Sequence, residues 1–249
     1  MKCIDINCDM GEGMLNDEAI MPFISSANIA CGYHAGNSDI MKQTVNLALQ
    51  YNIAIGAHPG FNDKENFGRK NHILSTTEYY DIFTDQIYTL QSITSQMGAK
   101  LHHIKPHGAL YNMAATNVDI ANILAQAIKD IDDSLILYGL CNSYLISAAK
   151  SVNIKTASEV FADRYYGDDG NLIPRTHTDS LIEDPNKSLE QIVNALINGY
   201  IKTLNGKKLP IYAETLCVHG DNKNILVFLE KITIGLVGYG IKIKRFDVS

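Results

Sequence analysis

Short runs of apolar residues alternate with longer segments of helical periodicity from one end of the chain to the other. The short runs are apolar and partly β-branched, which is typical of the buried strands of a parallel sheet. We expect eight strands, at Cys3–Cys8, Ala27–Cys31, Ile53–Ala57, Leu101–Lys105, Leu135–Leu140, Thr156–Phe161, Thr215–Val218 and Ile241–Phe246.

The segments between these runs carry apolar residues every three or four positions, which predicts amphipathic helices. The pattern is most regular from Leu189 to Leu204. Ser75 and Glu78 have the spacing of a capping box, before a helix that Gly98 is expected to end. We expect Ser38 to cap another helix, and further helices at Ile120–Ile131, 142–151 and Ile225–Leu236.

Strands that alternate with helices predict parallel βαβ units. Seven or eight such units in 249 residues are typical of a closed or nearly closed (β/α) barrel of about seven parallel strands. A doubly wound open sheet is the alternative α/β architecture. No glycine-rich, serine-rich or charged linker divides the chain, so we expect a single domain over residues 1–249.

The charge and the cysteine content exclude several classes of partner. Lysine and arginine number 21 against 27 aspartates and glutamates, so the net charge is −6 and no basic stripe faces nucleic acid. No apolar stretch is long enough to span a membrane. The five cysteines include no CxxC pair, which favours buried thiols in a reducing cytoplasm. Four of them are expected to pack in or beside strands: Cys3, Cys8, Cys31 and Cys217.

Polar residues collect directly after the expected strands, where the active sites of parallel barrels lie. Four of the eight histidines occupy such positions, each with a glycine within two residues: His34, His58, His107 and His219. Neighbouring parallel strands would bring these four side chains together at one mouth of the barrel. We expect surface or packing roles for His72, His102 and His103, whereas His177 lies in a loop and is assigned no role.

Carboxylates accompany these histidines. Asp9 lies at the end of the first strand, and Glu12 follows between two glycines. Asp9, His34 and His58 together form a carboxylate–His–His set that suits a divalent metal ion. Asp5, on the same strand as Asp9, is a candidate for a buried structural carboxylate paired with a base.

The scarce arginines indicate an anionic ligand. The chain has only four, and three of them, Arg69, Arg164 and Arg175, fall in loops after the expected strands. Lys105 precedes Pro106, which favours an extended strand end. From there it could neutralise a substrate carboxylate or phosphate, with an ordinary surface lysine as the alternative. Arginine binds carboxylate and phosphate with two parallel hydrogen bonds, although a structural salt bridge explains any one of the three equally well. The sequence contains no P-loop, no GxGxxG after the first strand, no GxSxG and no HExxH.

The same strand-end segments carry a family resemblance. They are DINCDMGEG, SSANIACGYHAGN, IGAHPGFNDKENFGRK, IKPHGALYN, EVFADRYYGDDGNLIPR and LCVHGDN, in this order along nearly the whole chain. Six ordered motifs make the match specific, and the chain resembles the LamB/YcsF family of 5-oxoprolinase A subunits. The resemblance implies a fold similar to the seven-stranded β/α barrels of the glycoside hydrolase/deacetylase class.

The resemblance also implies an activity, namely the ATP-dependent opening of 5-oxo-L-proline to L-glutamate together with partner subunits B and C. ATP would then be a cosubstrate, bound on this chain or largely on a partner. Phosphorylation of the amide oxygen would make the ring carbon electrophilic enough for water to attack. We expect catalytic roles for Asp9, His34, His58, Lys105 and His107. We expect substrate contacts from Asn7, Glu12, Arg69, Asn112, Arg164, Arg175, His219 and Asp221.

The sequence departs from the family pattern at three places. Asn37 replaces the usual aspartate after HAG, Lys223 replaces a common proline after HGDN, and residues 176–180 lack the usual small-residue pattern. Two further functions stay open from the residues themselves. One is a metal-dependent deacetylase or amidohydrolase, and the other is a ligand-binding subunit whose chemistry takes place on its partners.

Overall fold

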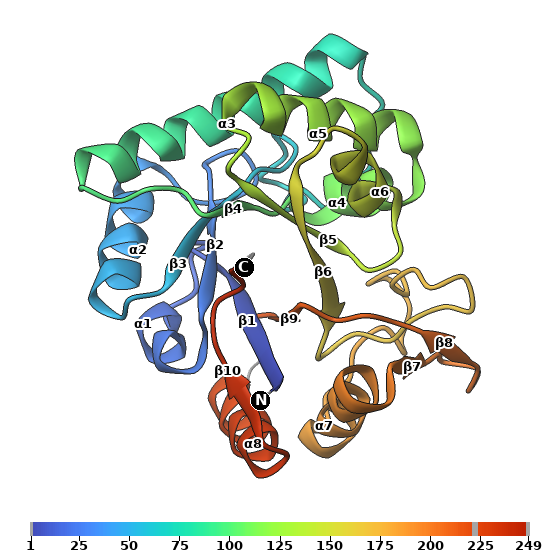
Figure 1. Cartoon of the computed structure of the whole chain (residues 1–249). Coiled ribbons are helices and arrows are strands. Elements are labelled where there is room, and N and C mark those ends of the chain that lie inside the picture. Colours follow the sequence, from blue (N-terminus) through green and yellow to red (C-terminus); the bar gives the residue numbers. More distant parts are fainter. Residues whose placement is uncertain (1, 221–223, 248–249) are drawn as a thin grey trace.

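Seven parallel strands form a closed barrel. The computed structural model describes residues 2–220 and 224–247. The strands follow the order β1-β2-β3-β4-β5-β6-β9, and β9 pairs back onto β1 to close the ring (Figure 1). Their bounds are Lys2–Met10 (β1), Ser26–Ala30 (β2), Ala54–His58 (β3), His103–Ile104 (β4), Ile136–Leu140 (β5), Lys155–Phe161 (β6) and Thr215–Val218 (β9).

An eighth parallel strand, β10 (Ile241–Ile243), lies outside the ring beside the first residues of β1. All eight strands expected from the apolar runs are therefore present, with bounds that differ by a few residues. Pairing of Asp5 with Thr215 and of Cys8 with Val218 excludes the open-sheet alternative, because it joins the first strand of the barrel to the last.

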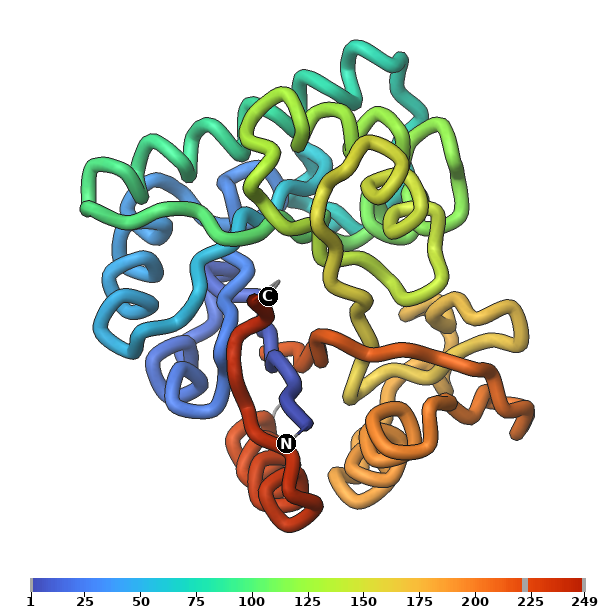
Figure 2. Tube along the Cα trace, in the orientation of Figure 1, coloured from blue at the N-terminus to red at the C-terminus, as the bar shows by residue number. Residues whose placement is uncertain are grey.

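Helices surround the barrel. The principal ones are α2 (Ser38–Gln50), α3 (Thr76–Gln96), α4 (Gly108–Thr116), α5 (Val118–Ile131), α6 (Tyr144–Ser151), α7 (Pro185–Val193) and α8 (Ile225–Gly238). The chain trace shows α2, α3, α5 and α6 succeeding one another around the strands, and α7 lying next to α8 (Figure 2). These helices cover the outside of the ring, so the sheet is buried on its outer face, whereas α4 lies at the mouth, where its residues line a cavity.

The helix starts follow local capping chemistry. Ser75 and Glu78 form the expected capping box, and Gly98 follows the end of α3 with a φ of +74°. The cap of α2 is Asn37 and not Ser38, since the Asn37 side chain accepts hydrogen bonds from the backbone N–H groups of Asp39 and Ile40. An aspartate at this position could accept the same bonds, so the departure of Asn37 from the family pattern preserves its capping role.

The helix expected from Leu189 to Leu204 ends early. It runs only to Val193 and is followed by one π-helical turn, Asn194–Asn198. Gly199 adopts a φ of +71° and stops the helix, because this left-handed conformation satisfies the last carbonyls without strain only at glycine. The remaining residues form an antiparallel hairpin of β7 (Tyr200–Lys202) and β8 (Lys208–Pro210), which lies beside the barrel in Figure 1.

Three further elements were not expected from the pattern. They are α1 (Asp17–Ile20), the 3-10 turn Met21–Phe23, and α4. The first two lie in the β1–β2 connection, and α4 starts inside the strand-end motif that contains His107 and Gly108. Their apolar faces are too short to give a helical period in the sequence.

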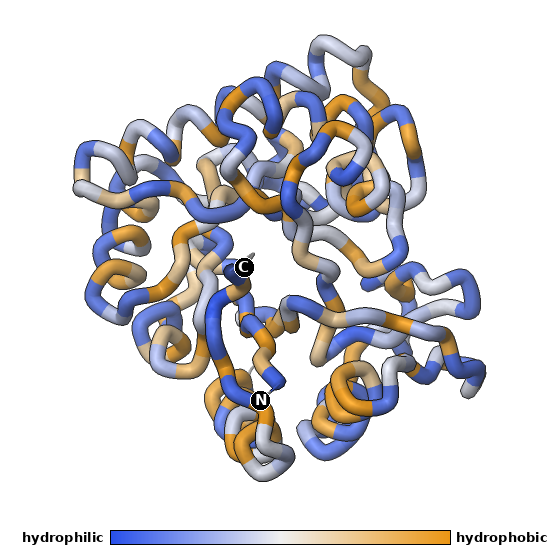
Figure 3. Tube along the Cα trace, in the orientation of Figure 1, coloured by the Kyte–Doolittle hydropathy of each residue, from blue (hydrophilic) through white to orange (hydrophobic). Residues whose placement is uncertain are grey.

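The barrel wall separates two kinds of core. Along β1, Ile4, Ile6, Cys8 and Met10 are buried against the outer helices, whereas the alternate residues point into the ring. Figure 3 shows that hydrophobic and hydrophilic residues alternate along the surrounding helices. The inward residues are polar and hydrogen-bond across the ring in successive layers: Asp5, Ser26 and Thr215, then Asn7, Asn28 and Glu159, then Asp9 and Lys105.

The cysteines are mostly packing residues, as expected. Cys8, Cys31, Cys141 and Cys217 are buried, and none of the five cysteines forms a disulfide. Cys3 is exposed, so its expected packing role is wrong. It sits in the first part of β1, before the strand enters the ring, where only β10 pairs with it. Within residues 2–220 and 224–247, no helix has both the length and the apolarity needed to cross a membrane.

Candidate active site

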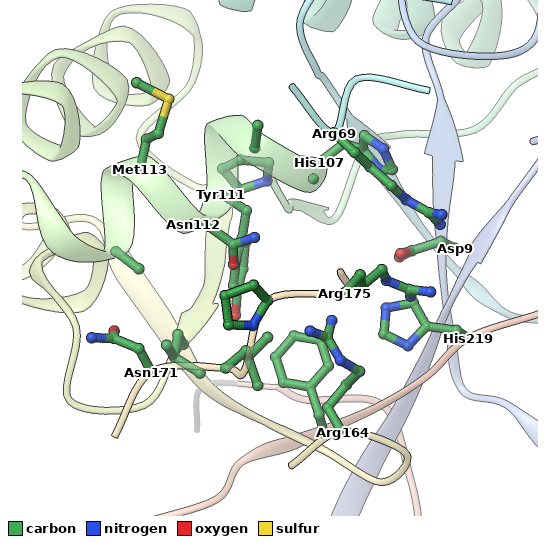
Figure 4. Close-up of a pocket in the computed structure, with 18 of the residues that line it drawn as sticks. Asp9, Arg69, His107, Tyr111, Asn112, Met113, Arg164, Asn171, Arg175 and His219 are labelled. Atoms are coloured by element: carbon green, nitrogen blue, oxygen red, sulfur yellow. The ribbon is translucent and has the colours of Figure 1, made fainter. Parts of the chain in front are cut away.

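A cavity of about 580 Å³ opens at the end of the barrel where the strands end. Its wall combines cationic, acidic and imidazole side chains with apolar ones. Figure 4 shows Arg69, Arg164, Arg175, Asp9 and His219 grouped on one side, and Asn112, Met113 and Asn171 on the other. The predicted site residues that line it are Asp9, Glu12, His58, Arg69, Lys105, His107, Asn112, Arg164, Arg175 and His219.

Lys105 forms the charged centre of the floor. Its ammonium lies 3.0 Å from Asp9 Oδ1, 3.0 Å from Glu159 Oε1, 3.1 Å from Asn7 Oδ1 and 3.1 Å from Cys217 Sγ. Burial alone would lower the pKa of Lys105, but these two carboxylates raise it well above its usual value. Lys105 is therefore a permanent cation with all its protons engaged, and it holds Asp9 in place.

Asp9 is an ionised carboxylate. Burial opposes its ionisation, but His58 and Lys105 together hold the pKa of Asp9 well below its usual value. Its Oδ1 also accepts a hydrogen bond from Asn28 Nδ2 at 2.8 Å, and its Oδ2 lies 3.3 Å from His58 Nε2. The carboxylate thus keeps a fixed orientation at the edge of the cavity.

A second layer of buried polar groups supports this floor. Asn7 donates to Glu159 and Thr215, and it accepts from Asn28 and Lys105. The second oxygen of Glu159 accepts a bond of 2.6 Å from the Tyr111 hydroxyl. The amide of Asn7 is fully engaged below the cavity.

Three histidines and Glu12 form a tight cluster. His107 Nδ1 lies 2.9 Å from His58 Nε2, and Glu12 Oε1 lies 3.1 Å from His34 Nε2, 3.4 Å from His107 Nδ1 and 3.9 Å from His58 Nε2. The rings of His34 and His107 are stacked, with centroids 3.7 Å apart and planes within 4°. His34 lies behind this stack, outside the residues that line the cavity.

Two glycines, Gly60 and Gly68, leave the space that the stacked rings of His34 and His107 occupy. A Cβ on Gly60 would stand 2.9 Å from His34 Nδ1, and one on Gly68 would stand 2.8 Å from the Cβ of His34. Gly68 also has a φ of +61°, a conformation that suits glycine. The loop after β3 can therefore close on the rings only with glycine at these positions.

Asp163 and His219 form a carboxylate–imidazole pair. Both Asp163 oxygens lie within 3.0 Å of His219 Nδ1, and the backbone N–H of His219 donates to the same carboxylate. His219 and Arg175 together lower the pKa of Asp163 against the opposing effect of burial. Because Nδ1 donates to Asp163, the Nε2 atom of His219 is left to exchange a proton.

Two arginines, Arg164 and Arg175, lie on the same side of the cavity as His219 (Figure 4). Arg164 is buried, and it donates from Nε to the Ser180 carbonyl and from its terminal nitrogen to the Ile173 carbonyl. Burial and the neighbouring charge of Arg175 lower the pKa of Arg164 to about 10, which still leaves it cationic at neutral pH. The two guanidinium groups repel each other, so an anion in the cavity would relieve an unfavourable arrangement.

The structure also shows which predicted residues stand apart. Asn7 and His34 lie behind the cavity wall, and Asp221 and Lys223 fall outside the described residues. His103 has the expected packing role, with its ring stacked on Tyr138 inside the barrel. His72 is partly exposed and hydrogen-bonds Asp63.

Sequence reasoning missed Asn28, Tyr111, Glu159 and Asp163. Glu159 and Asn28 sit within apolar runs and carry no motif of their own. Their signal is that each is a polar residue inside an otherwise apolar strand, which a buried strand carries only when the polar group has a partner in the interior. Asp163 directly follows a strand, in a segment quoted for the family resemblance, and could have been chosen on position.

The fold and the site define the class of protein. It is a closed seven-stranded β/α barrel whose mouth is rich in carboxylate, imidazole and arginine side chains. The model of the LamB/YcsF family matches residues 4–249, and the chain belongs to this family.

Curated relatives cover almost the whole chain. The A subunit of 5-oxoprolinase from Bacillus cereus (strain 03BB102) is 48% identical over 238 residues, which is 93% of this chain and 94% of that protein. The A subunit of 5-oxoprolinase from Staphylococcus aureus (strain Newman) is 46% identical over 246 residues, which is 97% of this chain and 98% of that protein.

Solved structures agree with the barrel. The lactam utilization protein from Thermus thermophilus superposes with a TM-score of 0.91 at 34% identity, covering 99% of this chain and 100% of that one. A family 4 carbohydrate esterase from Streptomyces lividans superposes with a TM-score of 0.53 at 10% identity, over 99% of this chain and 93% of that one. At that identity the second likeness concerns the fold alone, and the expected similarity to deacetylase barrels is confirmed.

Proposed function

We propose that this chain is the A component of an ATP-dependent 5-oxoprolinase. It binds 5-oxo-L-proline and hydrolyses the lactam to L-glutamate, coupled to hydrolysis of ATP to ADP and phosphate. The names of the two curated relatives and of the Thermus structure support the substrate class. The observation that carries the proposal is the cavity itself, in which two adjacent guanidinium groups face an ionised carboxylate and a histidine–aspartate pair.

The cationic rim suits the two anionic groups of the reaction. Arg69, Arg164 and Arg175 would hold the substrate carboxylate and the phosphoryl group, since guanidinium binds both with directed hydrogen bonds. Ligand cavities typically measure about 300–1,000 Å³. A cavity of about 580 Å³ therefore leaves room for a phosphoryl group beside one amino-acid-sized lactam.

The attacking water is handled by His219, which accepts its proton, and by Asp9, which orients it. His219 Nε2 accepts a proton from the attacking water, and Asp163 stabilises the imidazolium that forms. Asp9 orients the water, because its carboxylate is fixed by Lys105 and Asn28 and lines the same cavity. Lys105 acts through Asp9 in this scheme and does not contact the substrate carboxylate.

ATP and partner subunits belong to the proposal as well. The chain contains no P-loop, so we assign the nucleotide to a shared site with partner subunits B and C. The four buried cysteines outside any disulfide favour a reducing compartment, and we place the protein in the cytoplasm.

The decisive experiment measures glutamate and phosphate release from 5-oxoproline with ATP, for this chain alone and with subunits B and C. We expect both products in equal amounts from the assembled complex. His219→Gln should lower kcat by about 10²–10⁴-fold, because it removes the proton acceptor. The matched control is His177→Gln, at an exposed loop histidine, which should keep wild-type turnover.

Three results would contradict the assignment. Absence of glutamate from the assembled complex would refute the lactam reaction. Hydrolysis without any ATP requirement would favour the metal-dependent amidohydrolase. Unchanged turnover in an intact complex that carries His219→Gln and Asp9→Asn would favour a ligand-binding subunit without chemistry of its own.

A further inference from the structure

We propose that Glu12, His58 and His107 form a binding site for one divalent transition-metal ion of the zinc class, with an open coordination position toward the cavity. The site is independent of the lactam assignment, since it concerns an ion held by this chain alone. The donor atoms are Glu12 Oε1, His58 Nε2 and His107 Nδ1, which belong to a group of ligand atoms that all lie within 4.8 Å of one another.

His58 and His107 each bind a backbone carbonyl through one ring nitrogen, and their other ring nitrogens face each other. His58 Nδ1 lies 2.8 Å from the Lys105 carbonyl, and His107 Nε2 lies 2.9 Å from the Phe67 carbonyl. A carbonyl only accepts, so both of these nitrogens carry a proton. The lone pairs of the two remaining nitrogens would then face each other 2.9 Å apart, beside a carboxylate, unless a positive charge lies between them. A cation between them removes this repulsion.

The distances suit a transition-metal ion. Zinc bonds of about 2.0–2.2 Å in a tetrahedral site place neighbouring ligand atoms about 3.4 Å apart. The three donor pairs are separated by 2.9 Å, 3.4 Å and 3.9 Å. Metal-binding histidines also usually donate their other N–H to a carbonyl or carboxylate, as His58 and His107 do.

His34 cannot join this set in its present orientation. A metal ion lies in the plane of the imidazole that binds it, and the planes of His34 and His107 are parallel and stacked at 3.7 Å. His34 instead donates from Nε2 to Glu12 Oε1, and so it is a positioning residue for the carboxylate. The sequence predicted Asp9, His34 and His58 as ligands, whereas the geometry favours Glu12 and His107 beside His58.

The three donors line the cavity, and His34 does not. Three protein ligands and one open position are typical of zinc sites that bind a water or a substrate oxygen. Asp9 Oδ2 lies 3.3 Å from His58 Nε2 and could orient a water on the ion. Among the described residues, Asp9, Cys217 and His219 form another group of possible ligands, but Asp9 and Cys217 already bind the Lys105 ammonium, whose charge repels a metal ion there.

The test measures metal binding by the purified full chain without any substrate. After treatment with a chelator, the chain is titrated with Zn²⁺ by calorimetry and with Co²⁺ by visible absorption. We expect one ion per chain, a Co²⁺ spectrum of low coordination number, and a Zn²⁺-dependent rise in Tm. Glu12→Gln, His58→Gln and His107→Gln should each weaken binding by at least about 100-fold. His177→Gln is the control and should bind as the wild type does.

His34→Phe separates the two ligand sets. It keeps a ring in the stack and removes only the hydrogen bond to Glu12, so we expect a loss of about 10–100-fold with the Co²⁺ spectrum retained. Complete loss in His34→Phe, with unchanged binding in Glu12→Gln, would overturn the proposed ligands. Wild-type chain that binds no Zn²⁺ or Co²⁺ would overturn the site, and would assign a shared proton to the His58–His107 pair. Circular dichroism of each variant verifies that it is folded, and none of these results depends on 5-oxoprolinase activity.

Discussion

Asp5 and Asp9 lie on the same strand, four residues apart, and both point into the barrel, yet their surroundings make them different acids. Asp5 sits in the closed interior and is 1% exposed. Its carboxylate accepts hydrogen bonds from the hydroxyls of Ser25, Ser26 and Thr215, at 2.6–2.7 Å. Burial outweighs these bonds and raises the pKa of Asp5.

Asp9 sits one layer beyond Asn7, at the mouth. Its neighbours are the Lys105 ammonium, the His58 ring and the Asn28 amide, and its pKa falls well below the usual value. The hydroxyls around Asp5 provide dipoles, but a full positive charge is needed to offset the loss of water around a buried carboxylate. The same strand thus supplies two inward carboxylates, and the side chains on the facing strands raise the pKa of one and lower the pKa of the other.

The largest expected effect comes from removing the charge that distinguishes the mouth. Lys105→Met leaves Asp9 and Glu159 buried without a counter-ion, and we expect a loss of about 3–5 kcal/mol in the free energy of unfolding. Urea unfolding followed by circular dichroism measures this loss.

Two further variants control that experiment. Lys42→Met, at an exposed position of α2, should change the stability by less than about 0.5 kcal/mol. Adding Glu159→Gln to Lys105→Met removes one of the two uncompensated carboxylates and should recover part of the loss. Equal stability of Lys105→Met and the wild type would show that the ammonium does not stabilise the mouth.

The second effect is catalytic. Asp9→Asn keeps acceptor oxygen for Lys105 and Asn28 but removes the charge, so we expect kcat of the assembled complex to fall by about 10²–10⁴-fold. Asp5→Asn, in the closed layer, should stay within about tenfold of the wild type. The glutamate-release assay measures both. Similar losses in the two variants would mean that the layers do not differ in function.

The smallest effect concerns the pH dependence of stability. The folded-state pKa of Asp5 is raised above 3.8, the ordinary value that represents the unfolded chain. The unfolded chain therefore releases this proton at a lower pH than the folded chain does. The contribution of Asp5 to the free energy of unfolding then falls as the pH rises from 3.8 through the folded pKa. Asp5→Asn lacks this loss, so its stability relative to the wild type should rise across that window, by no more than about 2 kcal/mol.

Unfolding free energies of the wild type and Asp5→Asn, measured from acid to neutral pH, provide the comparison. If the unfolding free energy of Asp5→Asn minus that of the wild type is constant with pH, or shrinks as the pH rises, burial does not determine the shift in the pKa of Asp5. The wild-type curve alone is insufficient, because Asp9 acts in the opposite direction and contributes stability that is lost as the pH falls below about 3.8.

Much of the fold could be predicted from local pattern. The eight apolar runs are the eight parallel strands, and the capping box at Ser75 starts a helix where its spacing indicated. The prediction of one helix from Leu189 to Leu204 was wrong, because the apolar period does not reveal that Gly199 adopts a left-handed conformation. Burial of Ile201 in the following hairpin then satisfies the apolar position without a helix.

The sequence by itself determined the strand and helix order, the barrel class, the family and the set of polar residues at the strand ends, because these depend on local periodicity and ordered motifs. Only the tertiary structure decided how that set is divided. It placed Asn7 and His34 behind the cavity, paired His219 with Asp163, and brought Glu159, from the middle of an apolar run, onto Lys105. Closure of the ring sets these contacts, since distances between side chains on different strands depend on register and ring orientation, which no local pattern encodes.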